Sequence, residues 1–98
     1  MWTLVLPPNT QYSPRVDESI EFNRSAFKHG IVEENIRYAI NRPQYEGPLE
    51  DDDNKYIVLG FDNSGNLLEI IYNLIDDEAI NVFHAMKCRS IFFHLLDA

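Results

Sequence analysis

The residues best suited to chemistry lie close together near the end of the chain, in the segment His84-Ala85-Met86-Lys87-Cys88-Arg89. Cleavage of an RNA phosphodiester needs a base that takes the 2′-hydroxyl proton, an acid that protonates the leaving oxygen, and cations that stabilise the developing negative charge. An imidazole suits both proton transfers, because the unperturbed pKa of histidine is about 6.5. The segment therefore predicts His84 as acid or base, with Lys87 and Arg89 as phosphate contacts. The alternative is that His84 continues the apolar face of a strand and that the two cations are only solvated.

A second set of basic residues lies in the first half of the chain. Lys28 and His29 precede a glycine, and Arg37 follows nine positions after Lys28. The guanidinium of an arginine is well shaped to bind phosphate, so Arg37 is a supporting catalytic candidate. Lys28 and His29 are candidates for binding RNA. The structural alternatives are that Lys28 and His29 favour the negative end of a helix dipole and that Arg37 pairs with Glu33 at i, i+4.

Metal and cysteine chemistry are not predicted. The three histidines have no spacing typical of a zinc site, and the loop 62–66 begins like a calcium-binding loop but has Leu67 where glycine is required. Cys88 is the single cysteine, so it forms no intramolecular disulfide, and no sequence feature assigns it a general base. We therefore expect no metal and no cofactor, and a reducing, intracellular environment.

The charge of the chain restricts which partners it can bind. It has 16 acidic and 8 basic residues among 98, a net charge of −8, so binding of RNA must depend on a local basic patch. Part of the negative excess is one run in a predicted loop, made of Glu50, Asp51, Asp52 and Asp53. This run supports a hypothesis of a different class, in which the protein is a non-catalytic interaction domain that binds a basic protein partner.

The hydrophobic pattern predicts which elements position these residues. A chain of 98 residues has room for one domain, which we place at 17–98 after an N-terminal arm at 1–16. A short strand at 19–22 leads into a helix at about 23–29, and a second helix ends at Arg42-Pro43. Strands follow at 56–61, 67–73 and 78–86, with a short edge strand near Tyr45 as an option, and a last helix begins at Ser90.

This order of elements predicts an α+β fold with two N-terminal helices, an antiparallel meander of three to four strands, and a C-terminal helix. Alternation along the last strand places Ile80, Val82, His84 and Met86 on one face. The apolar runs are too short to span a membrane, and the N-terminus does not have the pattern of a signal peptide. We therefore expect a cytoplasmic protein.

Three segments of the chain resemble one family. Lys28-His29-Gly30-Ile31-Val32-Glu33-Glu34, the strands Tyr56-Ile57-Val58-Leu59-Gly60 and Leu67-Leu68-Glu69-Ile70-Ile71-Tyr72, and the ending His84-Ala85-Met86 resemble the BrnT-type toxins of bacterial toxin–antitoxin modules. These toxins are similar to compact RelE ribonucleases. The resemblance covers residues 19 to 96 and implies a metal-independent endoribonuclease that cuts messenger RNA and is neutralised by an antitoxin with a DNA-binding domain. It matches Lys28 and His29 to the Lys-His-Gly segment of the family, and His84 and Arg89 to its last strand and the segment after it.

Overall fold

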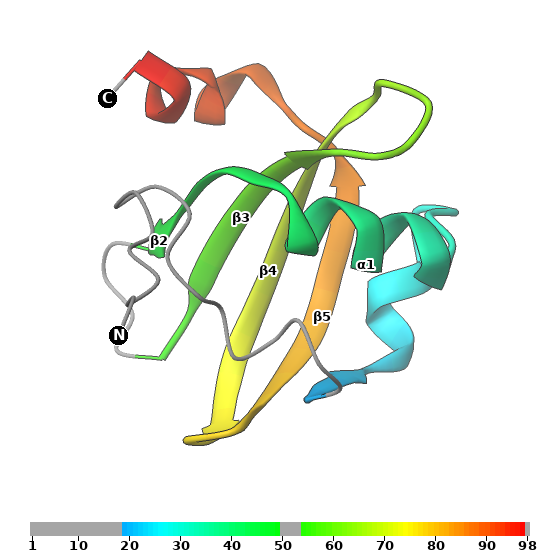
Figure 1. Ribbon diagram of the computed structural model, residues 1–98, viewed down its shortest axis with the longest axis vertical. Helices are drawn as coiled ribbons and strands as arrows, with labels where there is room; N and C mark the ends of the chain where they lie inside the picture. The colour runs from blue at the N-terminus through cyan, green and yellow to red at the C-terminus, as the bar shows by residue number, and fades with distance from the viewer. Residues whose placement is uncertain (1–18, 50–53, 98) are drawn as a thin grey trace, which may run out of the picture.

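Five strands form one mixed sheet in the order β1-β5-β4-β3-β2 in the computed structural model, which describes residues 19–49 and 54–97 (Figure 1). The strands are β1 (Ile20–Phe22), β2 (Pro43–Pro48), β3 (Tyr56–Phe61), β4 (Leu67–Asp76) and β5 (Ala79–Lys87). Strand β1 pairs with β5 in parallel, and the other neighbours are antiparallel. The helical elements are the 3-10 helix η3 (Arg24–Phe27), the α-helix α1 (Glu33–Asn41) and the 3-10 helix η4 (Ser90–Asp97).

One face of the sheet is covered by α1, which lies across it in Figure 1. The helix buries Ile36, Ala39 and Ile40 in the same hydrophobic cluster as Val58, Leu68 and Ile70 of the sheet. The spacing of these helix residues places them on one side of α1. At Gly60 the helix comes so close that a Cβ atom would collide with the backbone carbonyl of Ala39. We call this side of the sheet the α1 face.

The connection between β3 and β4 is a tight hairpin turn whose hydrogen bonds are all local. The carboxylate of Asp62 accepts hydrogen bonds from the backbone N–H of Ser64 at 2.8 Å and of Asn66 at 2.9 Å. Gly65 has a φ of 86°, a conformation that glycine adopts without strain. The turn holds β3 and β4 in register, with Phe61 opposite Leu67.

A β-bulge in β5 interrupts the regular alternation of its side chains. Ile71 pairs with His84 and Tyr72 pairs with Val82, so Phe83 is an extra residue on this strand. As a result Val82 belongs to the core on the α1 face, as do Ile80 and Ala85. His84 lies opposite Ile71, on the other face. The prediction that His84 shares a face with Ile80 and Val82 is wrong, because the bulge shifts the alternation by one residue.

The second face of the sheet carries the residues that alternate with the core positions of β4 and β5. In β4 these are Glu69 and Ile71, and in β5 they are His84 and Met86, which lie opposite Ile71 and Glu69 in the register. We call this side the Glu69 face.

The predicted fold class, with two N-terminal helices and an antiparallel meander of three to four strands, is wrong. The structure is a mixed α/β fold in which strands predominate. The expected first helix is a single 3-10 turn, since the Asn23 side chain accepts a hydrogen bond from the Ser25 N–H and Gly30 ends the turn at a φ of 84°. The last element is η4, a 3-10 helix with no buried residue.

The sheet has more strands than the predicted three to four, because the short strand predicted at 19–22 and the optional edge strand near Tyr45 both join it. Residues 20–22 pair with β5 in the register Ile20↔Ile80, which makes the sheet mixed, and residues 43–48 pair with β3 as β2. The predicted helix before Arg42 and the three predicted strands are confirmed as α1, β3, β4 and β5. The predicted arm, residues 1–16, lies outside the described residues. Within the described part of the chain, no helix is long and apolar enough to cross a membrane.

Candidate functional site

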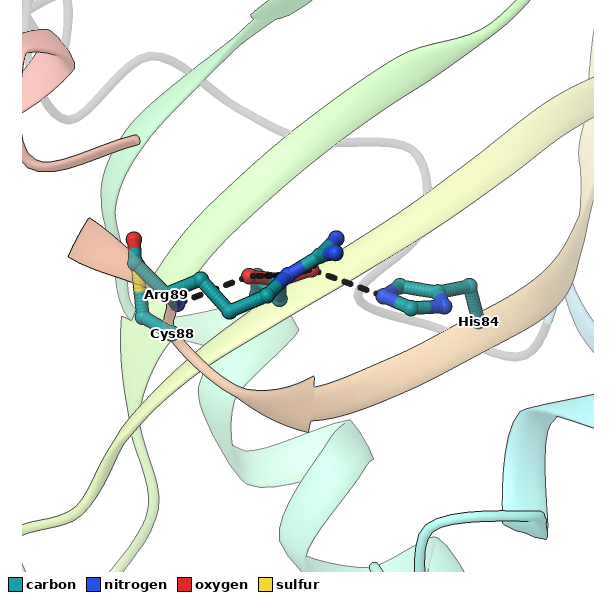
Figure 2. Close-up of polar contacts among 4 residues, drawn as sticks. His84, Cys88 and Arg89 are labelled. Carbon is teal, nitrogen blue, oxygen red and sulfur yellow. Dashed lines mark hydrogen bonds and ion pairs between the residues drawn. The ribbon is translucent and has the colours of Figure 1, made fainter. Parts of the chain in front are cut away.

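The candidate site is built around Glu69, a fully buried carboxylate on the second face of the sheet. Its oxygen Oε1 accepts hydrogen bonds from the backbone N–H of Arg89 at 2.8 Å and from Arg89 Nε at 3.1 Å. The oxygen Oε2 accepts from Arg89 Nη2 at 2.5 Å and lies 2.8 Å from Nε2 of His84. Figure 2 shows His84 and Arg89 extending toward one another, and the dashed lines mark the contacts that each makes with the carboxylate oxygens of Glu69. We call these three residues the Glu69 cluster.

The partners of Glu69 keep its carboxylate ionised. Burial alone would raise the pKa of Glu69, but hydrogen bonds from the side chain and backbone of Arg89 and from His84 outweigh burial and lower this pKa. The side-chain hydrogen bonds to Glu69, together with its negative charge, raise the pKa of Arg89. An ionised carboxylate has no proton to donate, so it can only accept hydrogen bonds.

The ionised carboxylate in turn fixes the tautomer of His84. Because Glu69 accepts the hydrogen bond, Nε2 of His84 must carry a proton, and in the neutral imidazole Nδ1 is then the acceptor. Among residues 19–49 and 54–97, no hydrogen bond to this Nδ1 is present. The side chain of His84 is 21% exposed. His84 therefore combines a fixed orientation with a ring nitrogen that can take up a proton.

Arg89 is oriented by Glu69 but keeps hydrogen-bonding capacity. Its side chain is 47% exposed, and its guanidinium lies over the ring of Phe92, 5.6 Å from the ring centroid. The contacts to Glu69 use Nε and Nη2. Nη1 makes no hydrogen bond within the described ranges, so it is available to an anion.

His29 completes the arrangement from a distant part of the chain. Its ring meets the ring of His84 edge to face, with the centroids 5.6 Å apart and an angle of 73° between the planes. His29 is exposed and follows η3. Of the six basic residues predicted to act on RNA, the structure thus brings together His84, Arg89 and His29.

The other predicted basic residues lie apart from the Glu69 cluster. Lys87 is opposite Leu68 in the register, so its side chain starts from the α1 face and not from the side of Glu69. Arg37 forms an ion pair with Glu33 at 2.8 Å, and its guanidinium lies over the ring of Phe22. The geometry therefore supports pairing with Glu33, and not binding of phosphate, as the role of Arg37. Lys28 is exposed and adjacent to His29, and within the described part of the chain its side chain forms no ion pair with the cluster.

The predicted partner-binding run, Glu50, Asp51, Asp52 and Asp53, lies outside the described residues. The pKa of Cys88 is raised, first by burial and then by the charge of Glu69, while Arg89 acts in the opposite direction. The Cys88 thiol therefore stays protonated near neutral pH, which does not suit a nucleophile.

Glu69 is the central residue of the site, and the sequence analysis did not identify it. The signal was a single carboxylate within an apolar strand, between Leu68 and Ile70. A charged residue is almost never fully buried unless it is paired, so a carboxylate at this position indicates a cationic or hydrogen-bonding partner. The partner could not be named, because His84 and Arg89 are 15 and 20 positions away.

Comparison with known proteins finds no relative of this chain. No protein-family model matches the chain, and no curated protein and no solved structure matches it either. Among the described residues, no group of three or more His, Cys, Asp or Glu side chains could hold a metal ion. The resemblance to BrnT-type toxins stays a prediction.

Proposed function

We propose that this protein is an endoribonuclease of the toxin class, in which His84 is the general base. The observation that carries the proposal is the contact of 2.8 Å between Nε2 of His84 and the buried carboxylate of Glu69. A carboxylate that accepts from one ring nitrogen holds the imidazole in one tautomer and stabilises the imidazolium that forms when the other nitrogen takes a proton. This is the geometry of an oriented proton acceptor at the surface of a fold.

The proposed reaction uses the 2′-hydroxyl of the RNA as the nucleophile. Nδ1 of His84 takes the hydroxyl proton, the 2′-oxygen forms a bond to phosphorus, and the bond from phosphorus to the 5′-oxygen breaks. The products are a 2′,3′-cyclic phosphate and a free 5′-hydroxyl. Nη1 of Arg89 faces the negative charge that develops on the phosphoryl oxygens, a role for which a positioned guanidinium is suited.

The proposal includes the partners and the location that the family resemblance implies. The substrate is messenger RNA in the cytoplasm, and the activity is neutralised by an antitoxin with a DNA-binding domain. Expression of the chain alone should arrest bacterial growth, and co-expression with the product of the neighbouring reading frame should restore it. The negative charge of the chain makes it a weak general binder of RNA, and with Arg89 as the phosphate contact of the proposed site we expect the affinity for RNA to fall only shallowly as the salt concentration rises.

The variant His84→Gln tests the proposal without removing the hydrogen bond to Glu69. The glutamine amide can donate to the carboxylate but cannot take up a proton, so we expect cleavage of single-stranded RNA to fall by about 100-fold or more. Growth arrest should be lost as well. The measurement is cleavage of an end-labelled RNA by the purified protein, together with thermal unfolding to show that the fold is intact.

His94→Gln is the matched control, because His94 is exposed on η4 and makes no hydrogen bond or ring contact among the described residues. It should cleave RNA like the wild type. Undiminished cleavage by His84→Gln would contradict the proposed role of His84. If the wild type neither arrests growth nor cuts RNA, the proposal is wrong, and the hypothesis of a domain that binds a basic protein becomes the one to test, by neutralising residues 50–53.

A further inference from the structure

We propose that His29 is the general acid of the same reaction, so that the substrate is an RNA phosphodiester bound across the adjoining imidazoles of His29 and His84. This inference rests on the proposed function and adds a second catalytic residue to it. The base must take a proton from one oxygen and the acid must give a proton to another, and each transfer needs a contact of about 3 Å. Because both oxygens are bound to the same phosphorus, the two groups have to be close neighbours.

The fold holds His29 beside His84 although the two residues are far apart in the sequence. Their ring centroids are 5.6 Å apart. The turn that carries His29 is anchored on the bulge of β5, since Ser25 Oγ donates to the carbonyl of Phe83 at 2.6 Å. The backbone N–H of Asn23 also donates to the carbonyl of Val82 at 2.8 Å. The bulge that turns His84 onto the second face thus also offers the carbonyl that positions His29.

The surroundings of the two imidazoles differ, because in the described part of the chain another side chain fixes the tautomer of His84 and not that of His29. His84 is held by Glu69 with its proton on Nε2, which leaves Nδ1 to act as the base. His29 is exposed, and within the described residues neither of its ring nitrogens makes a hydrogen bond. Its ring can therefore turn toward a bound phosphodiester and exchange its proton with water between reactions.

The proton balance of the reaction closes with these two residues. The 2′-hydroxyl loses its proton to His84 as the bond from the 2′-oxygen to phosphorus forms. The imidazolium of His29 gives a proton to the 5′-oxygen as the bond from this oxygen to phosphorus breaks. Water then returns a proton to His29 and takes one from His84. The 2′-hydroxyl is a reactant, so RNA is a substrate and DNA is not.

The test separates protonation of the leaving group from binding. The cleavage site in a single-stranded oligoribonucleotide is first mapped with the wild type, and a second oligonucleotide is made with sulfur in place of the bridging 5′-oxygen at that site. A thiolate leaves without being protonated, so this substrate does not need a general acid. His29→Gln should cleave the ordinary RNA about 100-fold more slowly, and the sulfur-containing RNA at nearly the wild-type rate. His84→Gln should be slow on both substrates, and His94→Gln should resemble the wild type on both.

The outcomes distinguish this inference from the proposed function. If His29→Gln slows both substrates by the same factor, His29 binds RNA or positions it, and the assignment as general acid is wrong. If His29→Gln cleaves the ordinary RNA like the wild type while His84→Gln does not, His29 has no part in the reaction and the proposed function still stands. If the wild type cleaves neither substrate, the proposed function itself fails.

Discussion

Two buried carboxylates in the described part of the chain differ in where their hydrogen-bond donors lie in the sequence. Asp62 is 7% exposed, and its carboxylate accepts hydrogen bonds from Ser64 and Asn66, all within four positions in its own turn. Glu69 is fully buried, and its hydrogen bonds come from His84 and Arg89, which follow 15 and 20 positions later. The first carboxylate closes a turn, whereas the second joins three separate parts of the chain.

This difference supports the place of Glu69, and not of Asp62, in the proposed function. A local turn of the Asp62 kind is explained by the hairpin that it closes. An ion pair with one buried member gives little net stability, because removing the charge from water costs about as much as the pair returns. What the Glu69 cluster does provide is a fixed orientation for an imidazole and a guanidinium. The presence of such a cluster in the Glu69 face favours a role in chemistry over a role in stability.

The largest expected effect is on stability, because Glu69→Gln should lower the free energy of unfolding by more than Asp62→Asn does. Glutamine places an NH₂ group among donors from Arg89, and breaking a buried pair costs about 3–5 kcal/mol. The guanidinium of Arg89 is half-exposed and can be hydrated, so we expect a smaller loss of about 2–3 kcal/mol in the free energy of unfolding. Asparagine keeps the oxygen Oδ1 that accepts from Ser64 and Asn66, so Asp62→Asn should cost less than about 1 kcal/mol.

Urea unfolding of the two variants and the wild type at neutral pH measures this contrast. Both substitutions replace one carboxylate oxygen by an amide nitrogen, so each variant is the control for the other. Equal losses of free energy would contradict the comparison and would show that the two carboxylates have the same structural role.

The same contrast explains how much of the site could be predicted from the sequence. The turn at Asp62 was predicted because its partners are neighbours in the chain and turn residues carry a local signal. The pairing of Glu69 depends on the bulge at Phe83, which decides the face on which His84 lies. A bulge leaves no clear signal in the alternation of β5, so His84 was placed on the wrong face and Glu69 was not connected to it.

The central elements were predicted with clear bounds, whereas at the edges short strands were predicted but their place in the sheet was not. The strands β3 and β4 and the helix α1 have enough residues for their period to show, and all three were predicted near their observed bounds. Strand β1 has three residues, and β2 lies between Pro43 and Pro48, so neither has a clear period of its own. The pairing of β1 with β5 and of β2 with β3 is a tertiary effect that the local sequence does not contain.

A smaller effect than the loss of stability at neutral pH is expected when the free energy of unfolding is followed as a function of pH. The pKa of Glu69 is lowered below its usual value of 4.5, despite burial, by Arg89 and His84. The pKa of Asp62 is lowered below 3.8, chiefly by the backbone hydrogen bond from Asn66. Below these values the unfolded state binds more protons than the folded state, so stability is lost as the pH falls through the folded pKa values. Both contributions are fully present above about pH 5.

Urea unfolding at a series of pH values from neutral to acid separates the two carboxylates. The difference in free energy of unfolding between the wild type and Glu69→Gln should shrink as the pH falls below 4.5, because the unfolded wild type binds a proton at Glu69 there and the variant does not. The difference for Asp62→Asn should be small and should shrink only at lower pH. A constant difference for Glu69→Gln over the whole range would mean that its loss comes from packing and not from the charge.

The smallest expected effect is on the reactivity of Cys88, which reports the charge of Glu69 from a neighbouring position. Burial raises the pKa of the thiol first, the negative charge of Glu69 raises it further, and Arg89 lowers it. Only the thiolate reacts with a disulfide reagent, so the folded protein should react more slowly than the protein unfolded in urea. Glu69→Gln removes the negative charge and should increase the rate in the folded state on the order of threefold. Asp62→Asn should leave it unchanged.

The pH profile of this reaction shows which cause is at work. If the charge of Glu69 acts on the thiol, Glu69→Gln moves the midpoint of the profile to lower pH and leaves the rate at high pH the same. If the substitution only opens the structure around Cys88, the rate rises at every pH and the midpoint stays in place. The second result would contradict the electrostatic account of the Glu69 cluster. The first would show that the carboxylate is charged in the folded protein, which is the state that fixes the tautomer of His84.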